Sequence, residues 1–477
     1  MRCPTRGAAS RITVGLVSTT GPLLQLVGDD LVVPCADGEQ RRYLSCDAAA
    51  STGALPSVLA AVEQFVPWYS SVHRGAGYKS QVATEAFEKA RGSVLAFAGR
   101  QGTDDVAIFC RNTTEAINHL AYRLRLAPDD VVVTTVVEHH ANMLPWARAA
   151  RCRFVECGRD GTFDVEAVEE ALDAVPRPRL LAVTGASNIT GWMPDVAGLV
   201  AAAHARGVPV LVDGAQLAPH RQLPTGADFV VWSGHKMYAP FGAGVLIGPR
   251  EVFAEGDPFL AGGGAVDLVT LDEVVWTGPP DREEAGSPNV VGAVALDAAV
   301  AELARVGWPA LTAHDRRLAT ALREGLAAVP GVHLLGPGLG TETLPVATFT
   351  VEGLPYALVA ARLSVEEAIG VRHGCFCAHP YLTRLLGLGP ADMERHRAAA
   401  RAGQRSELPG AVRASLGANA STEDVERLCA ALDRIVSGGP PPVRYVREPG
   451  SGDFVPEDGS APWLAGLRAH TSSCAPG

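Results

Sequence analysis

The sequence predicts an α/β fold, with a large domain built on a mostly parallel sheet covered by helices and a smaller α/β domain. Two observations predict it. Short apolar runs alternate with helical stretches through the middle of the chain, and residues suited to chemistry follow the ends of several of these runs. Such alternation is typical of parallel sheets, in which ligands bind beyond the carboxyl ends of the strands.

Six β-branched or apolar runs are the expected strands: Val106–Phe109, Val131–Thr135, Leu180–Thr184, Val208–Val212, Phe229–Trp232 and Gly244–Ile247. Ala/Leu/Glu/Arg-rich segments with helical spacing lie between several of them, for example Val165–Ala174 and Val196–Arg206. A long Ala/Leu/Val helix around Gly292–Val306 is expected to lead into the second domain.

The composition narrows the class of protein. With 47% hydrophobic and 19% charged residues, the 477-residue chain has ample material for packed cores. The net charge of −11 argues against non-specific nucleic-acid binding. Polar residues interrupt the apolar stretch Ile12–Val27, and no run is long enough to cross a bilayer, so we expect neither a signal peptide nor a membrane span. Ten scattered cysteines predict a cytoplasmic protein with mostly free thiols.

Lys236 comes directly after the apolar run Phe229–Trp232, in Ser233-Gly234-His235-Lys236. A lysine held past a buried strand end among small residues is suited to act as a neutral amine nucleophile toward a carbonyl cofactor. The plainer interpretation is a lysine in a surface turn.

Three further strand ends carry polar groups. Asp213 ends an apolar run, where a carboxylate would pair with a protonated pyridine nitrogen or simply cap a helix, and Gln216 follows it. Thr113 and Thr114 open a helix after Val106–Phe109, and hydroxyls and N–H groups at a helix start bind phosphate.

His139 follows Val131–Thr135 and would stack on a flat aromatic ring. The alternative is a metal site made by His139, His140, Cys375 and Cys377. Adjacent histidines and a C-x-C pair do not match the usual zinc spacings, so we expect no metal.

Five longer motifs occur in one order along the chain: EHHAN-x-x-PW, SNITG, DGAQ-x-x-PH, SGHKMYAP-x-G-x-G and EAGSPN. Together they resemble the class V (fold type I) aminotransferase superfamily, which depends on pyridoxal 5′-phosphate (PLP), and in particular its cysteine desulfurase and selenocysteine lyase branch. The resemblance covers roughly residues 43–435. It implies a seven-stranded, mostly parallel sheet in the large domain.

The resemblance also implies domain limits and subunit organisation. We expect residues 1–40 to pack with the small domain, 41–300 to form the large PLP-binding domain, and 301–438 to form the small domain carrying Cys377 and Arg413. Residues 439–477 are rich in Pro, Gly and Ser and are expected to be a loosely held extension. Relatives are homodimers with shared active sites, so a homodimer is expected here.

The resemblance implies a role for each residue that matches a functional position of the family. Lys236 would hold PLP as a Schiff base, Asp213 would pair with its pyridine nitrogen, Asn188 and Gln216 would contact its phenolic oxygen, and His139 would stack on its ring. Thr113, Thr114, Ser233 and His235 would hold the phosphate, joined by Ser287 from across a dimer interface. Arg413 would clamp the substrate carboxylate, a task suited to a planar guanidinium, and Arg372 and His73 (in Ser70–Gly75) would help to bind substrate.

Cys377 aligns with the cysteine that attacks the substrate sulfur in desulfurases, and Cys375 stands where many relatives have histidine. The motif Gly-Cys-Phe-Cys also resembles the corresponding motif of molybdenum-cofactor sulfurases. Arg372, His373 and His379 are expected to favour the Cys377 thiolate. The plainer interpretation, which we favour for Cys375, is a cysteine that packs as a small hydrophobe.

The expected activity is removal of sulfur from L-cysteine or a related sulfur amino acid, giving alanine and a Cys377 persulfide. A sulfur-acceptor protein is an expected partner. The alternatives are a C–S lyase that forms pyruvate by β-elimination, a transaminase or epimerase, or a non-catalytic sulfur carrier. Two segments depart from the desulfurases, the longer stretch Thr383–Gly410 with its helical run Ala391–Arg405, and the tail beyond Gly439.

Overall fold

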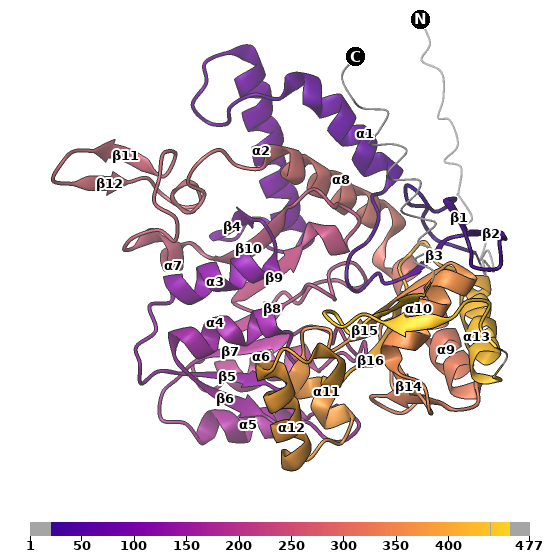
Figure 1. Cartoon of the computed structure of the whole chain (residues 1–477). Helices are drawn as coiled ribbons and strands as arrows, with labels where there is room; N and C mark the ends of the chain where they lie inside the picture. Colours follow the sequence, from indigo (N-terminus) through magenta and orange to yellow (C-terminus); the bar gives the residue numbers. More distant parts are fainter. Residues whose placement is uncertain (1–20, 439, 458–477) are drawn as a thin grey trace, which may run out of the picture.

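Two sheets of different size organise the chain (Figure 1). The structure, a computed structural model, describes residues 21–438 and 440–457. The predicted N-terminal segment before residue 21 and the end of the predicted extension after residue 457 lie outside the described residues. No helix in the described ranges is long and apolar enough to cross a bilayer.

The large sheet has seven strands in the order β4-β10-β9-β8-β7-β5-β6. β10 runs antiparallel to both neighbours, and the other pairs are parallel. This confirms the predicted seven-stranded, mostly parallel sheet. The strands are β4 (Asp105–Cys110), β5 (Val131–Thr135), β6 (Arg151–Val155), β7 (Pro178–Thr184), β8 (Val210–Asp213), β9 (Phe229–Ser233) and β10 (Gly244–Pro249).

Successive side chains of these strands enter two different hydrophobic cores. Val230 packs in one core with Val168, whereas its neighbour Val231 packs in the other with Ile117 and Trp146. Side chains of a strand alternate between the faces of a sheet, so both faces are covered. The covering helices are α3 (Thr113–Arg123), α4 (Leu144–Ala149) and α7 (Arg250–Ala254) on one face, and α5 (Val165–Asp173), α6 (Val196–His204) and α8 (Val290–Val306) on the other.

The helices predicted from periodicity are present as α3, α5, α6 and α8. α1 (Pro56–Phe65) and α2 (Tyr78–Phe97) pack against α8. A hairpin of β11 (Val266–Val269) and β12 (Val274–Trp276) projects from the large domain (Figure 1).

The small domain carries a five-stranded sheet in the order β13-β14-β16-β15-β3. Its strands are β3 (Leu44–Cys46), β13 (Val332–Leu335), β14 (Val346–Val351), β15 (Ile369–Gly374) and β16 (Ala411–Ser415), with helices α9 (Trp308–Ala328), α10 (Tyr356–Glu367) and α13 (Thr422–Val436). β3 pairs in parallel with β15, so a segment from near the N-terminus completes this sheet. A short pair of strands, β1 (Val32–Pro34) and β2 (Gln40–Arg42), precedes it.

The two segments expected to differ from the desulfurases contain regular structure. Thr383–Gly410 contains the end of α11 (His379–Leu385), α12 (Pro390–Arg401) and a 3-10 turn, η5 (Arg405–Glu407). Beyond Gly439, β17 (Tyr445–Arg447) and β18 (Phe454–Pro456) form an antiparallel hairpin beside α10, drawn in yellow in Figure 1. The expectation of a loosely held tail does not hold for residues 440–457, because the Tyr445 hydroxyl donates to Glu366 of α10 at 3.0 Å.

Candidate active site

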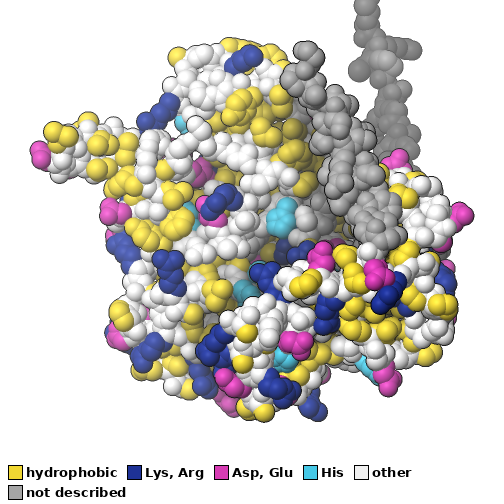
Figure 2. Space-filling model, viewed as in Figure 1, with side chains coloured by type: hydrophobic (Ala, Val, Ile, Leu, Met, Phe, Trp, Pro, Cys, Tyr) yellow, Lys and Arg dark blue, Asp and Glu magenta, His cyan; other side chains and the backbone are white. Residues whose placement is uncertain are grey.

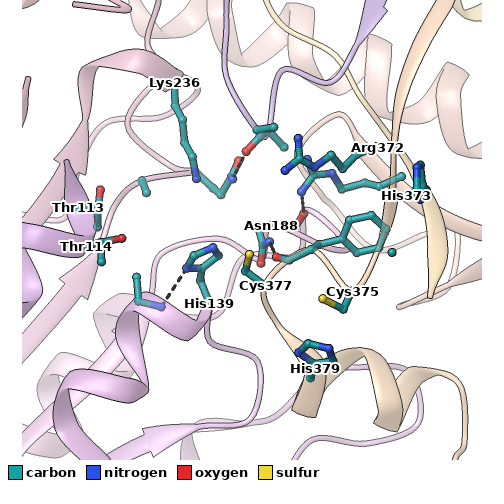
Figure 3. A pocket seen from close by; sticks show the side chains of 18 of the residues that line it. Thr113, Thr114, His139, Asn188, Lys236, Arg372, His373, Cys375, Cys377 and His379 are labelled. Carbon is teal, nitrogen blue, oxygen red and sulfur yellow. Dashed lines mark hydrogen bonds between the residues drawn. The ribbon is translucent and has the colours of Figure 1, made fainter. Parts of the chain in front are cut away.

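A cavity of about 580 Å³ lies where β5, β7, β8 and β9 end and the small domain begins. It is lined by most of the predicted site residues: Thr113, Thr114, His139, Asn188, Asp213, Gln216, Ser233, His235, Lys236, Arg372, Cys377 and Arg413. Figure 3 shows Thr113 and Thr114 on one side of this space, Arg372 and His373 on the other, and His139 and Cys377 between them.

Lys236 ends the 3-10 turn η3 (Gly234–Lys236), which follows β9 directly. Burial lowers the pKa of its amine to about 8, although the nearby Asp213 carboxylate acts in the opposite direction. A lysine normally titrates near 10.4, so this amine reaches its neutral, nucleophilic form close to neutral pH.

Asp213 is the last residue of β8 and is buried. Its Oδ1 accepts a hydrogen bond from the Ala215 amide at 2.9 Å, and burial raises the pKa of the carboxyl group. A buried carboxylate with so little protein hydrogen bonding is suited to a cationic N–H group brought by a ligand.

Two side-chain amides lie near it. Gln216 donates through Nε2 to the Ala49 carbonyl at 2.7 Å, and Asn188 donates through Nδ2 to the Phe376 carbonyl at 2.7 Å. Because an amide nitrogen carries two hydrogens, each group retains one donor for a ligand.

The start of α3 forms a cluster of hydroxyl and N–H groups. The Thr113 amide donates to the Ser233 hydroxyl at 2.8 Å, and the Thr113 and Ser233 hydroxyls lie 2.7 Å apart. The Asn112 side chain caps the helix by accepting from the Glu115 amide. Together with the helix dipole, this arrangement is suited to an anion such as phosphate. Beside it, burial and then Lys236 lower the pKa of His235 to about 4, so this ring is neutral.

His139 lines the same cavity, and a backbone amide of its own loop orients its ring. Its Nδ1 accepts from the Ala141 amide at 3.0 Å, which places the proton of the neutral ring on Nε2. Burial, followed by the charge of Lys236, lowers the pKa of His139 to about 3.

The preceding residue, Glu138, fastens this loop to the sheet. Its carboxyl group accepts from the Thr135 hydroxyl at 2.8 Å, the Thr184 amide at 3.0 Å and the Asn142 side chain at 2.7 Å. These three contacts join the ends of β5 and β7 to the 3-10 turn η2 (His140–Asn142). Burial raises the pKa of Glu138 to about 8.

Arg413 lies in the middle of β16 and is buried. Its guanidinium donates to the Asn188 carbonyl and to Asp47 Oδ1, each at 2.9 Å, while its Nε has no partner. The Asp47 carboxylate also lies 3.6 Å from Arg372. A buried guanidinium with a free N–H is suited to bind a carboxylate from a ligand. The sequence did not point to Asp47, because it lies 366 positions from Arg413.

Cys377 sits on a tight loop between β15 and α11. Phe376 and Cys377 both have left-handed backbone angles, with φ of 55° and 56°. The loop is secured by the His140 amide, which donates to the Cys377 carbonyl at 2.7 Å, and by stacking of the His140 and His379 rings 5.1 Å apart. Strained non-glycine backbone of this kind is concentrated at functional sites. Cys377 is exposed and Cys375 half-buried, and both line the cavity.

Two of the predicted site residues, His73 and Ser287, do not line the cavity. His73 does not line the cavity of its own chain and pairs instead with Glu88 at 2.8 Å. Ser287 is exposed and also lies outside it, at the position predicted to serve a second subunit. Among the described residues, His139, His140, Cys375 and Cys377 do not converge to the spacing of a metal site.

Comparison with known proteins places this site in a family. The family model described as aminotransferase class-V matches residues 43–428, and the chain belongs to this PLP-dependent family. A cysteine desulfurase of Klebsiella pneumoniae (strain 342) is 34% identical over 84% of this chain and 94% of its own length. A probable cysteine desulfurase of Mycobacterium leprae is 38% identical over 66% of this chain. The matched part makes up only 52% of the length of that relative. The chain is therefore a homologue of cysteine desulfurases within the class V aminotransferases.

Solved structures agree. A cysteine desulfurase from Thermococcus onnurineus NA1 superposes with a TM-score of 0.74 at 31% identity, covering 83% of this chain and 95% of that one. A cysteine desulfurase from Escherichia coli gives a TM-score of 0.70 at 31% identity, again covering 83% and 95%. These similarities confirm the α/β fold and the predicted branch of the family.

The residues of the cavity fit PLP. The Lys236 amine forms no hydrogen bond or ion pair among the described residues and faces the cavity, with the buried Asp213 carboxylate at a neighbouring strand end. The hydroxyl and N–H cluster at the start of α3 supplies the phosphate-binding chemistry.

Proposed function

We propose that this chain is a PLP-dependent cysteine desulfurase, which removes sulfur from L-cysteine or a related sulfur amino acid and leaves alanine. The observation that carries the proposal is that a single cavity brings together the Lys236 amine, the Arg413 guanidinium and the Cys377 thiol. The desulfurase homologues support it.

We assign the cofactor contacts to this chain's residues as follows. Lys236 holds the aldehyde carbon, Asp213 pairs with the pyridine nitrogen, and Asn188 and Gln216 donate to the phenolic oxygen. His139 stacks on the ring, and Thr113, Thr114, Ser233 and His235 bind the phosphate. When bound, PLP supplies an electron sink for the negative charge that develops at the substrate Cα.

The remaining steps belong to side chains. Arg413, with Arg372 beside it, orients the substrate by its carboxylate, and Lys236 as a neutral amine accepts the Cα proton. The Cys377 thiolate then attacks the substrate sulfur. A bond forms between the two sulfurs, the substrate Cβ–S bond breaks with its electron pair going to carbon, and Cβ gains a proton. Cysteine and the Cys377 thiol thus become alanine and a Cys377 persulfide, with no external oxidant or reductant.

The test compares products from two neighbouring cysteines. Wild-type protein loaded with PLP and given L-cysteine should form alanine, and Cys377→Ala should lose at least about a hundredfold in rate, because its nucleophile is gone. Cys375→Ala is the matched control and should remain active. Pyruvate as the main product, with Cys377→Ala still active, would show the alternative C–S lyase instead.

We further propose that the protein works as a homodimer in a reducing cytosol. The β11–β12 hairpin exposes Leu268, Val269 and Leu271 to solvent, and Figure 2 shows it as a largely hydrophobic projection. Apolar surface of this kind is normally covered by a partner. The eight cysteines of the described ranges are all unpaired, which supports the reducing compartment.

A further inference from the structure

Two segments near the C-terminal end of the described chain contribute residues to the lining of the cavity. Arg405, Leu408 and Pro409 come from the end of the Thr383–Gly410 segment. Ser451, Gly452 and Asp453 come from the turn of the β17–β18 hairpin, which lies beyond the last residue matched by the family model. The hairpin turn therefore gives the pocket residues from outside the part of the chain that the family model matches.

The turn is held firmly against η5. An added Cβ at Gly452 would lie 3.0 Å from both the Cα and the amide nitrogen of Ser406, so the two backbones touch. Within the turn, the Gly452 amide donates to the Glu448 carbonyl at 2.9 Å, and the Glu448 amide donates to the Asp453 carbonyl at 2.8 Å. Because Arg405 precedes Ser406 and Asp453 follows Gly452, this contact places the two charged residues on adjoining backbone.

Both charges are available to a ligand. Within the described part of the chain, the exposed Arg405 guanidinium has no hydrogen bond or ion pair. The Asp453 side chain is 47% exposed, and its ionic contact is His373 at 3.5 Å. Burial lowers the pKa of His373, so this ring is mostly neutral and leaves the carboxylate charge uncompensated. One cation and one anion thus line the same cavity from adjoining segments.

These charges stand close to the reactive loop. His373, which contacts Asp453, is on β15, two residues before Cys375 in the sequence. Tyr356, Cys375 and Asp453 all line the same cavity. In Figure 3, Cys375 lies between Cys377, near the centre of the pocket, and His373 at one side of it.

We propose that Arg405 and Asp453 form a subsite for the zwitterionic head group of a small thiol, an amino-acid-like acceptor that takes the sulfur from Cys377. The inference rests on the proposed desulfurase function. A carboxylate of the acceptor pairs with Arg405 and its ammonium group with Asp453, because opposite charges on adjoining backbone complement such a head group.

The transfer step balances without a further reactant. The acceptor thiolate attacks the terminal sulfur of the Cys377 persulfide and forms a new S–S bond. The bond between Cys377 Sγ and the terminal sulfur breaks, and Cys377 leaves as a thiolate that takes up the proton released by the acceptor thiol. The acceptor departs as a persulfide.

The test uses the full chain loaded with PLP. One turnover with limiting L-cysteine loads the persulfide, alanine release is measured, and small molecules are removed. Four thiols are then added separately: L-homocysteine, which has both charges, 3-mercaptopropionate, which has only the carboxylate, cysteamine, which has only the ammonium group, and neutral 2-mercaptoethanol. Loss of persulfide is followed by mass spectrometry against thiol concentration.

Removal of either charge should weaken the binding of only those thiols that carry the complementary charge. Arg405→Gln should raise the half-saturating concentration of homocysteine and mercaptopropionate about tenfold, and Asp453→Asn that of homocysteine and cysteamine, since charge-assisted hydrogen bonds contribute at this level. Mercaptoethanol should respond to neither change. Arg401→Gln, at the end of α12 and outside the cavity, is the matched control and should change nothing.

Two failures are distinguishable. If no alanine and no persulfide form in the loading step, the proposed function is wrong. If loading succeeds but the two variants treat all four thiols alike, or the persulfide reacts only with a protein acceptor, the subsite is wrong and the desulfurase function stands.

Discussion

The reactivity of Lys236 comes from a balance of two opposing effects at one atom. Burial disfavours the ammonium form, and the Asp213 carboxylate favours it. Burial prevails and brings the pKa to about 8. Asp213 is itself buried, and the same burial raises the pKa of its carboxyl group.

The pH dependence of cofactor uptake follows from this value. Only the neutral amine attacks the aldehyde, so the rate at which the cofactor-free protein takes up PLP should rise with pH and reach half its maximum near pH 8. The rate is measured from the growth of the visible absorption band between pH 6 and 10. Lys236→Ala should give no such band. A rate that is still far from its maximum at pH 10, as the ordinary lysine pKa near 10.4 would give, would contradict the role of burial.

Individual site residues differed in how far the sequence pointed to them. Lys236, Asp213, Thr113 and His139 each follow a recognisable strand, so their convergence at one sheet edge could be predicted. Asp47, Arg405 and Asp453 carry no such signal. Arg405 and Asp453 line the cavity, and Asp47 binds Arg413, which lines it. These positions depend on contacts between segments far apart in the chain, which local sequence patterns do not encode.

Among the elements, the buried strands were the easiest to predict. β5 and β9 are buried along their whole length and β7 along most of it, and each contains a continuous apolar run, as expected of strands covered on both faces. β6 was not predicted, because this edge strand has two exposed arginines and one buried residue. The antiparallel direction of β10 was also not specified, since direction leaves no mark on the apolar run itself.

The C-terminal hairpin depends on one glycine. Gly452 has a φ of +81°, and its backbone touches Ser406, so Gly452→Ala should destabilise the hairpin by roughly 1–2 kcal/mol from the backbone conformation alone. Hydrogen exchange of the amides of residues 445–457 should become faster, because the hairpin opens more often.

Gly450→Ala is the matched control for this experiment. It lies in the same turn, but an added Cβ there meets nothing within 4 Å. Exchange should therefore stay close to that of the wild type. Equal exchange rates in the two variants would show that the Ser406 contact does not hold the hairpin in place.

At the scale of the whole molecule, Ser287, which is predicted to serve a second subunit, lies near the segment that carries His73 and near the apolar β11–β12 hairpin. Arg74, next to His73, donates to the carbonyls of Gly264 and Val266 at the base of the β11–β12 hairpin, at 3.1 and 3.0 Å. The Gly286 amide, next to Ser287, donates to the Gly263 carbonyl at 2.7 Å. His73 and Ser287, which do not line the cavity of their own chain, thus lie near the base of the apolar β11–β12 hairpin. This arrangement is expected if this part of the surface contributes to the cavity of a partner subunit.

Mixing two inactive variants tests the shared site. Ser287→Asp should repel the cofactor phosphate bound in the partner, and Lys236→Ala removes the amine of its own site. In a mixed dimer, the subunit that retains Lys236 receives an intact Ser287 from the other, so one complete site forms. Activity should therefore reappear after the two inactive proteins are unfolded and refolded together, as measured by alanine formation. If Ser287 served its own subunit, neither site of the mixed dimer would be complete, and the mixture would stay as inactive as its parents.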